Sequence, residues 1–207
     1  KITIQYSPGL PKFYYTRLTN LFPKPTRTMV DITNDVNLAF DHVENPFNEF
    51  DREPLIPFMV SREGPALAVG DANGDGLDDV FIGSSKGYKS AIFFQRPGGK
   101  FERSNQPELD ADSTYEDVDA TWIDVNNDGK TDLVIAAGGN EYYGNDPYQQ
   151  PRVYLNYGHE HFTKLDHAFD NIFLTASCVV PDDFNGAGYP ASFIGVGAVQ
   201  WEVGHLQ

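Results

Sequence analysis

The sequence predicts an all-β protein, namely part of a β-propeller built of four-stranded blades, and three observations lead to this fold class. An acidic loop motif occurs twice between short apolar runs, and a degenerate third copy follows it. The copies begin at Asp71, Asp124 and Asp183, at spacings of 53 and 59 residues. After each intact copy come two further apolar runs separated by a glycine-containing turn. A unit of four short strands that recurs in this way is typical of a propeller blade.

The two intact loops fit the pattern D-x-N-x-D-G-x-x-D, which predicts calcium binding. Ca²⁺ takes six to eight oxygen ligands at about 2.3–2.6 Å, and alternate side chains of a tightly curled loop point inward. Glycine at position 6 permits the sharp turn, and position 7 adds a backbone carbonyl. The predicted ligands are Asp71, Asn73, Asp75, Leu77 and Asp79 in the first loop, and Asp124, Asn126, Asp128, Lys130 and Asp132 in the second.

Two other interpretations of these loops compete with calcium binding. Asn-Gly and Asp-Gly pairs also mark surface turns that hold no metal, although two copies with every ligand position kept favour the metal site. An EF-hand needs a glutamate at position 12 and a helix on each side. Position 12 is Ile82 in one loop and Ile135 in the other. The flanking runs are short and β-branched, which indicates strands rather than helices.

The third copy, which begins at Asp183, has lost most of its charge. It keeps Asp183, Asn185 and a glycine at positions 1, 3 and 6, but Ala187 and Ala191 replace the carboxylates of positions 5 and 9. We therefore expect weak calcium binding or none at this loop.

The second pair of apolar runs in each repeat predicts a β-hairpin. Residues 91–94 and 100–103 are separated by Pro97-Gly98-Gly99, and residues 153–156 and 161–163 are separated by Gly158-His159-Glu160. Apolar runs joined by such short glycine-containing turns are typical of hairpins.

The loops and their flanking strands resemble FG-GAP/VCBS repeats, which occur in integrin α-subunit propellers and in many secreted bacterial proteins. The lead-in Val30-Asp31-Ile32-Thr33 and Phe40-Asp41-His42, which runs into residues 64–71, more narrowly resembles the ASPIC/UnbV-associated group related to cartilage acidic protein. The resemblance covers about residues 28–200. It implies an extracellular or cell-surface propeller, usually seven-bladed, that serves adhesion or ligand display. The degenerate third loop departs from the family pattern.

The expected domain organisation is a lead-in followed by repeats. Residues 1–60, which begin with a strand-like segment at 1–6 and include a proline-containing linker at 20–27, form an irregular segment or an atypical blade. Residues 61–207 hold the repeats, at about 61–113, 114–175 and an incomplete 176–207. Seven blades of this size need about 370–410 residues. We therefore expect that the chain is a fragment, or that other blades or other copies complete its core.

The charge of the chain restricts its partners. Thirty acidic residues against 15 basic ones give a formal charge of −15, which argues against nucleic acid and anionic membrane surfaces. No apolar run approaches the 18–20 residues of a membrane span. Six carboxylates occupy the ligand positions of the two intact loops, where they repel one another without a cation. Two Ca²⁺ ions would change the charge from −15 to −11, so metal binding and folding are expected to be coupled.

A longer connection in the second repeat, residues 138–151, is a candidate ligand-binding loop. Insertions on repeat scaffolds tend to lie on the binding face, and tyrosines with amides suit contacts to sugars or peptides. The alternative is that the tyrosines pack on a neighbouring blade. The candidate residues are Asn140, Glu141, Tyr142, Tyr143 and Tyr148.

The remaining candidates for chemistry are weaker. His159 and His161 form an H-x-H pair that suits zinc but falls in a predicted turn. The group Glu116, Asp117 and Asp119 suits either a second shell around a metal or an exposed acidic face. No nucleophile elbow, P-loop or dinucleotide motif occurs. We expect a non-enzymatic, secreted or cell-surface binding module that recognises protein or glycan. The alternatives are a self-assembling structural protein and a non-catalytic part of a calcium-dependent polysaccharide-degrading enzyme.

Overall fold

The computed structural model describes residues 14, 29–184, 186, 188 and 191–198. The chain divides into two compact units, Lys1–Ile32 and Thr33–Gln207. The described residues of the first unit form no helix or strand. The strand predicted at residues 1–6, the linker at 20–27 and the ligand candidate Asn185 lie outside the described residues.

The second unit begins with a lead-in segment, residues 33–66, all of which the structure describes. Its regular secondary structure consists of two short helices. These are α2 (Thr33–Val36) and the 3₁₀ helix η2 (Glu49–Asp51). Leu38 and Phe40 of this segment pack against a cluster of buried residues on the first sheet, Val80, Ala91 and Phe93. The lead-in segment therefore covers one face of that sheet.

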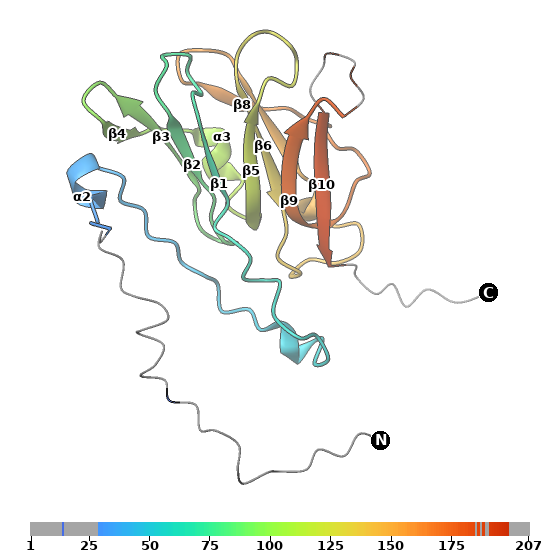
Figure 1. Cartoon of the computed structure of the whole chain (residues 1–207). Coiled ribbons are helices and arrows are strands. Elements are labelled where there is room, and N and C mark those ends of the chain that lie inside the picture. The colour runs from blue at the N-terminus through green and yellow to red at the C-terminus, as the bar shows by residue number, and fades with distance from the viewer. Residues whose placement is uncertain (1–13, 15–28, 185, 187, 189–190, 199–207) are drawn as a thin grey trace. The chain divides into compact units, whose positions relative to one another are not determined.

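Sheet 1 contains four antiparallel strands in chain order (Figure 1). They are β1 (Leu67–Gly70), β2 (Asp79–Ile82), β3 (Ala91–Arg96) and β4 (Lys100–Arg103). Arg96 lies opposite Lys100 across the β3–β4 turn, which confirms the first predicted hairpin.

Sheet 2 repeats the same order after helix α3 (Pro107–Ala111). Its strands are β5 (Asp117–Ile123), β6 (Asp132–Ala137), β7 (Arg152–Asn156) and β8 (Phe162–Lys164), and the 3₁₀ helix η3 (Pro147–Gln149) lies between β6 and β7. Asn156 lies opposite Phe162, which confirms the second hairpin. Strands rather than helices flank both acidic loops, as predicted, which rules out an EF-hand.

Sheet 3 consists of β9 (Thr175–Asp182) and β10 (Ala191–Ala198), paired antiparallel with irregular register near Gly195 and Val196. With these three antiparallel sheets and only short helices in the described part of the chain, the predicted all-β class is confirmed. None of the described helices is long and apolar enough to cross a membrane.

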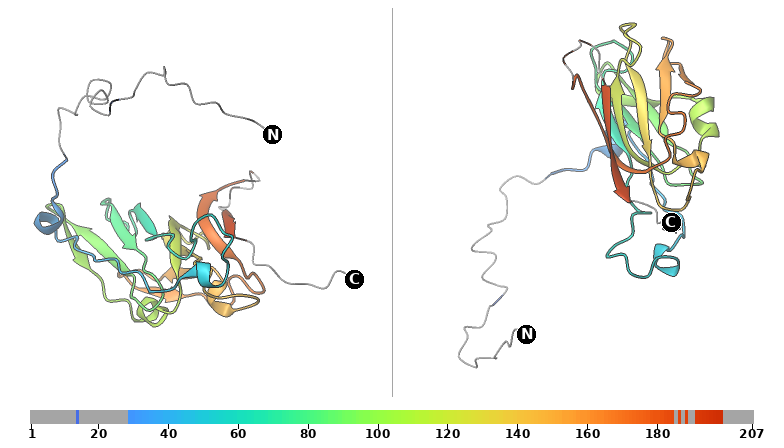
Figure 2. Two further views of the ribbon diagram at one scale, coloured as in Figure 1. Left: turned by 90° about the horizontal axis from the view of Figure 1, so that it is seen from below. Right: turned by 90° about the vertical axis from the view of Figure 1, so that its right-hand side faces the viewer.

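The three sheets follow one another side by side, as the view from below in Figure 2 shows. Their first strands, β1, β5 and β9, are neighbours in that order. The segments that join β1 to β2 and β5 to β6 lie at the same end of sheets 1 and 2, at the top of Figure 1. Equivalent acidic loops are thereby brought to one rim of the molecule.

Strand β6 explains why the apolar runs are continuous rather than alternating. Its residues are buried on both faces: Leu133 and Ile135 belong to the core shared with sheet 1, and Val134 and Ala136 belong to the core shared with sheet 3. Successive side chains of a strand point to opposite faces, so residues 133–137 of β6, whose sheet is packed on both faces, are all apolar, and only Asp132 at its start is polar.

Candidate metal-binding loops

Both intact loops join the first and second strands of a four-stranded sheet. The first begins at Asp71, directly after β1, and its ninth position, Asp79, is the first residue of β2. The second begins at Asp124, directly after β5, and its ninth position, Asp132, is the first residue of β6. The two loops therefore have the same place in consecutive sheets.

The aspartate at position 1 organises each loop by accepting hydrogen bonds from backbone N–H groups. Asp71 Oδ2 accepts from Gly76 N at 2.8 Å, and Asp124 Oδ2 accepts from Gly129 N at 2.8 Å. The two glycines have φ values of +84° and +83°, a left-handed conformation that glycine adopts without steric cost. The carboxylate at position 1 thus lies inside a closed curl of backbone.

The degenerate third loop keeps this local geometry. Asp183 Oδ2 accepts from Gly188 N at 2.8 Å, and Gly188 has a φ of +80°. The bond between positions 1 and 6 therefore does not depend on the carboxylates of positions 5 and 9, which this loop lacks.

Positions 3 and 5 fold back on the loop in the same way in both intact copies. Asn73 Oδ1 accepts from Asp75 N at 3.0 Å, and Asp75 Oδ1 accepts from Leu77 N at 2.8 Å. The second loop repeats these bonds at Asn126 and Asp128, at 2.9 Å each. The predicted ligands at positions 3 and 5 are therefore held in both loops by hydrogen bonds from the backbone of the same loop.

Position 9 differs from the others because it is buried. The two oxygens of Asp79 accept from Ala72 N at 3.0 Å and from Gln95 N, on β3, at 2.8 Å. Asp132 makes the equivalent bonds to Val125 N and Asn156 N. Burial raises the pKa of both carboxyls, although the bonds from the backbone amides oppose that shift. Each of these aspartates ties the start of its loop to the third strand.

The donor set fits a hard cation. Each loop offers three carboxylates, one amide oxygen and a carbonyl, which is the oxygen chemistry that Ca²⁺ prefers. As the side chains lie, no group of three or more His, Cys, Asp or Glu in the described residues is gathered closely enough to hold a metal ion. The carboxylates instead accept backbone N–H groups, and an oxygen with two lone pairs that accepts one such bond keeps one for a cation.

The candidate ligand-binding loop at residues 138–151 is buried at its two ends and exposed at residues 143–145, 147 and 148. Asn140 is buried, and its Nδ2 donates to Glu49 Oε1 at 2.7 Å. Glu141 pairs with Lys86 at 2.9 Å, and Tyr142 donates its hydroxyl hydrogen to Thr114 O at 2.9 Å.

The two other tyrosines of this loop differ in exposure. Tyr148 packs against Tyr142 and Tyr115, with ring centroids 5.2 and 5.1 Å apart. Tyr143 is 73% exposed, with the guanidinium of Arg52 at 5.8 Å from its ring centroid. Tyr143 is therefore the candidate that is most available to a ligand.

The other carboxylates singled out from the sequence are mostly structural. Asp117 is buried and pairs with the buried Arg152, and Asp119 Oδ2 accepts from Val179 N at 2.8 Å. Glu116 is also buried, and this desolvation raises its pKa to about 8. An exposed acidic face is therefore the wrong interpretation for Glu116 and Asp117, because both lie between packed sheets.

The candidate pair His159 and His161, and His42 of the lead-in segment, lie in separate local contacts. His159 has a φ of +53° in the β7–β8 turn, and His161 Nε2 lies 3.3 Å from the hydroxyl of Thr163. His42 Nε2 lies 2.7 Å from Glu44 Oε1 in the lead-in segment.

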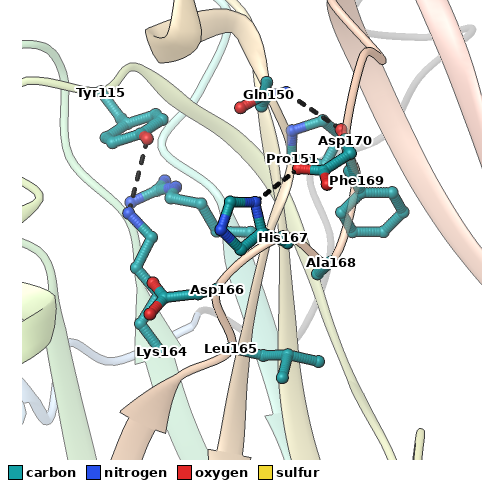
Figure 3. A pocket seen from close by; sticks show the side chains of 11 residues that line it. Tyr115, Gln150, Pro151, Lys164, Leu165, Asp166, His167, Ala168, Phe169 and Asp170 are labelled. Atoms are coloured by element: carbon teal, nitrogen blue, oxygen red, sulfur yellow. Dashed lines mark hydrogen bonds and ion pairs between the residues drawn. The ribbon is translucent and has the colours of Figure 1, made fainter.

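A pocket of about 210 Å³ lies beside β7 and β8, and no residue of the acidic loops lines it (Figure 3). Lys164 Nζ lies 3.4 Å from the hydroxyl oxygen of Tyr115 in this pocket, and His167 pairs with Asp170 at 2.9 Å. The other two basic side chains that line the pocket, Lys164 and Arg152, pair with Asp112 and Asp117, which lie outside its lining.

Sequence reasoning missed a contact that reaches the first loop from sheet 2, and the residue that supports it. Glu160, in the β7–β8 turn of sheet 2, contacts Asn73, and Arg96 of sheet 1 pairs with Glu160. The sequence offers no signal for this contact, because 87 residues separate Glu160 from Asn73.

Comparison with known proteins supports the fold. No curated protein matches the chain. Residues 71–135, which run from position 1 of the first loop to the middle of β6, match the model of the FG-GAP-like repeat. This part of the chain, with its acidic loops between the first two strands of successive sheets, therefore carries the signature of the FG-GAP repeat family.

Proposed function

We propose that this chain is a segment of a calcium-stabilised β-propeller that acts as a secreted or cell-surface binding module. The observation that carries the proposal is the recurrence of one acidic loop at the same end of consecutive sheets, with the same bond between positions 1 and 6. The match to the FG-GAP-like repeat supports the propeller. In this proposal each sheet is one blade, and the ASPIC/UnbV-associated group is the subfamily.

The proposed calcium ligands are the ten predicted from the sequence, with Asp183 and Asn185 as a weak third site. A bound Ca²⁺ would supply two positive charges, which offset the mutual repulsion of three loop carboxylates. The chain's own contribution is to hold those carboxylates in place before the ion arrives. Because the loops connect strands β1 to β2 and β5 to β6, fixing the loops also fixes the strand ends.

The proposed ligand is a protein or a glycan, and binding rather than catalysis is the proposed activity. Tyr143 supports this choice, since an exposed tyrosine provides a rigid contact surface at low entropic cost. A glycan array, probed with the wild-type protein and with Tyr143→Ala, tests this part of the proposal. Glycan binding that Tyr143→Ala leaves unchanged would assign recognition to another surface.

Calorimetric titration of the chelator-treated protein with CaCl₂ tests the metal proposal. We expect binding with dissociation constants of about 10⁻⁴–10⁻³ M, as for other extracellular modules, and weaker binding of Mg²⁺. The absence of binding heat, together with identical melting temperatures in calcium and in EDTA, would overturn it.

A second candidate function, self-assembly with other chains, is favoured by the exposed apolar face of sheet 3. Val180, Phe193 and Val196 are 47%, 58% and 51% exposed, and Phe193 lies opposite Val180 across β9 and β10. Exposed apolar patches of this kind mark interaction surfaces. Analytical ultracentrifugation should then show a mass that rises with concentration and that Phe193→Ser lowers; a constant monomer mass contradicts this candidate.

A further inference from the structure

The turn between β7 and β8 places an acidic side chain of sheet 2 against the first loop of sheet 1. His159 and Glu160 both have left-handed backbone, with φ values of +53° and +59°. The turn is closed by His161 N, which donates to Gly158 O at 3.1 Å. It is anchored to the preceding repeat by Gln106 Nε2, which donates to Glu160 O at 2.6 Å. The position of Glu160 is therefore set by backbone contacts on both sides.

The carboxylate of Glu160 is held by a partner from sheet 1. Arg96 donates to both of its oxygens, and the bond from Nη2 to Oε2 measures 2.8 Å. The same guanidinium donates from Nε to Glu102 Oε2 at 2.9 Å. Both oxygens of Glu160 are therefore held by Arg96, and this fixes the position in which the carboxylate faces the loop.

Two carboxylates orient the amide of Asn73, one from its own loop and one from sheet 2. Asn73 Nδ2 donates to Asp75 Oδ2 at 3.2 Å and to Glu160 Oε1 at 3.3 Å, and Asn73 Oδ1 points back to the loop backbone, where it accepts from Asp75 N. A carboxylate accepts hydrogen bonds and cannot donate them, so only the NH₂ end of the amide can face Glu160. A metal at the loop needs the opposite end, the oxygen. Glu160 thus reinforces, from the neighbouring sheet, the orientation that a metal ligand at position 3 requires.

The second loop differs from the first at two equivalent points. Asn126 Nδ2 donates to Asp128 Oδ2 at 3.4 Å, as Asn73 Nδ2 does to Asp75 Oδ2, but among the described residues it has no second carboxylate contact like the one that Glu160 makes with Asn73. Lys130 stands at position 7, where the first loop has Leu77, and its Nζ lies 3.1 Å from Asp128 Oδ2. A lysine ammonium on a carboxylate ligand competes with an incoming cation.

We propose that Glu160 is a positioning residue for the first metal loop, and that this contact, together with Lys130 in the second loop, makes the first loop the tighter calcium site. The inference rests on the proposed calcium binding. It adds that the neighbouring blade controls the affinity of the first loop through the orientation of one amide.

Calcium titration of matched variants tests this proposal. To isolate the first loop, the titrations use a background in which Asp128→Asn weakens the second. Glu160→Gln should weaken calcium binding by about tenfold, the effect of losing one hydrogen bond to a charged group. Glu102→Gln is the control, because Glu102 binds the same arginine but does not touch Asn73. In the converse background, Asp75→Asn, the change Lys130→Leu should strengthen binding at the second loop by several-fold.

A variant of Asn73 separates orientation from a general structural effect. In Asn73→Asp both ends of the side chain are oxygens, so no orientation remains to be selected and Glu160 only repels. Glu160→Gln in that background should leave affinity unchanged or raise it. A tenfold loss that persists in Asn73→Asp, or equal effects of Glu160→Gln and Glu102→Gln, would overturn the proposal while calcium binding itself stands. A wild-type protein that binds no calcium would instead refute the proposed function.

Discussion

Two aspartates of the first loop differ in burial, and this difference separates their expected roles. Asp75 is exposed, and its Oδ1 accepts one backbone bond within the loop. Asp79 is buried and accepts backbone bonds from Ala72 and from Gln95 on a separate strand. Asp79 therefore supports the fold whether or not a cation is present, whereas Asp75 matters chiefly to the cation.

We expect that Asp79→Ala destabilises the protein by about 2–4 kcal/mol in EDTA, because two N–H groups lose their acceptor, and by more in calcium, because a metal ligand is lost as well. Asp75→Ala, the matched control, should change stability by less than about 0.5 kcal/mol in EDTA. In millimolar calcium it should lower the melting temperature by several degrees. Urea unfolding and thermal melts measure both effects, and an Asp75→Ala loss that is equal in EDTA and calcium would count against a metal role.

Glu116 predicts a dependence of stability on pH. Its Oε2 accepts from Lys86 N at 2.8 Å, its Oε1 has no partner among the described residues, and the carboxylates of Glu44, Glu141 and Asp117 add to its charge repulsion. Its pKa is about 8 in the folded protein, against an ordinary value of 4.5. The stability that this group contributes is full below pH 4.5 and is lost as the pH rises towards 8.

Glu116→Gln should therefore become increasingly more stable than the wild type as the pH rises from 5 to 8. We expect a gain of several degrees in melting temperature at pH 8, because one pKa unit corresponds to about 1.4 kcal/mol. The exposed Asp51→Asn serves as the control and should show no such trend. A difference between Glu116→Gln and the wild type that stays constant over this pH range contradicts the buried, protonated carboxyl.

At the scale of the elements, the glycines that end β2 and β6 allow neighbouring sheets to approach closely. A Cβ on Gly83 would lie 2.6 Å from Asp117 Cβ, at the start of β5, and 2.7 Å from Ala66 Cβ. A Cβ on Gly138 would lie 2.4 Å from Val118 Cγ1 and 2.7 Å from Ala176 O, on β9. These equivalent glycines lie at the contacts between sheets 1 and 2 and between sheets 2 and 3.

We predict that Gly83→Ala destabilises the protein by about 1–3 kcal/mol, because the methyl group forces sheets 1 and 2 apart. Gly70→Ala is the control, since a Cβ there would lie 3.3 Å from Trp122 Cδ1, a milder contact. Chemical unfolding of the two variants measures the difference, and an equal loss in both would show that the sheets can separate without cost.

At the scale of the whole molecule, the loops are linked to one another through the sheets. Asn156 Nδ2, on β7, donates to Ala72 O of the first loop at 2.7 Å and to Thr131 O of the second at 3.0 Å. Glu160 adds a contact from sheet 2 to the first loop. A cation that orders one loop should therefore stabilise the contact between sheets 1 and 2 as well as the turn that binds it.

Calcium should accordingly stabilise the fold as a whole. At a concentration 10–100 times the dissociation constant, each occupied site adds about 1.4–2.7 kcal/mol to the free energy of unfolding. Unfolding curves recorded over a series of calcium concentrations should shift together by far-UV circular dichroism and by tryptophan fluorescence. Loss of a signal from one sheet alone, with the rest unaffected by calcium, would contradict this linkage.

Local features of this protein follow directly from its sequence. The loop motif, its flanking apolar runs and the Gly98-Gly99 turn each extend over a few residues, and their backbone conformations depend on neighbours in the chain. The hairpins, the strands on either side of both loops and the all-β class are therefore readable without a structure. The recurring motif also made the resemblance to FG-GAP repeats visible in the sequence, and the match over residues 71–135 supports that resemblance.

Only the tertiary structure decided which distant residues meet. The contact of Glu160 with Asn73, the burial of Glu116 and the bond from Asn140 to Glu49 join segments 87, 30 and 91 residues apart. Such contacts depend on the twist and spacing of packed sheets, to which every core residue contributes a little. No short sequence pattern encodes the combined effect of so many core residues. The sequence by itself therefore determined the composition and local backbone of each loop, whereas the packing of the sheets determined which residues surround it.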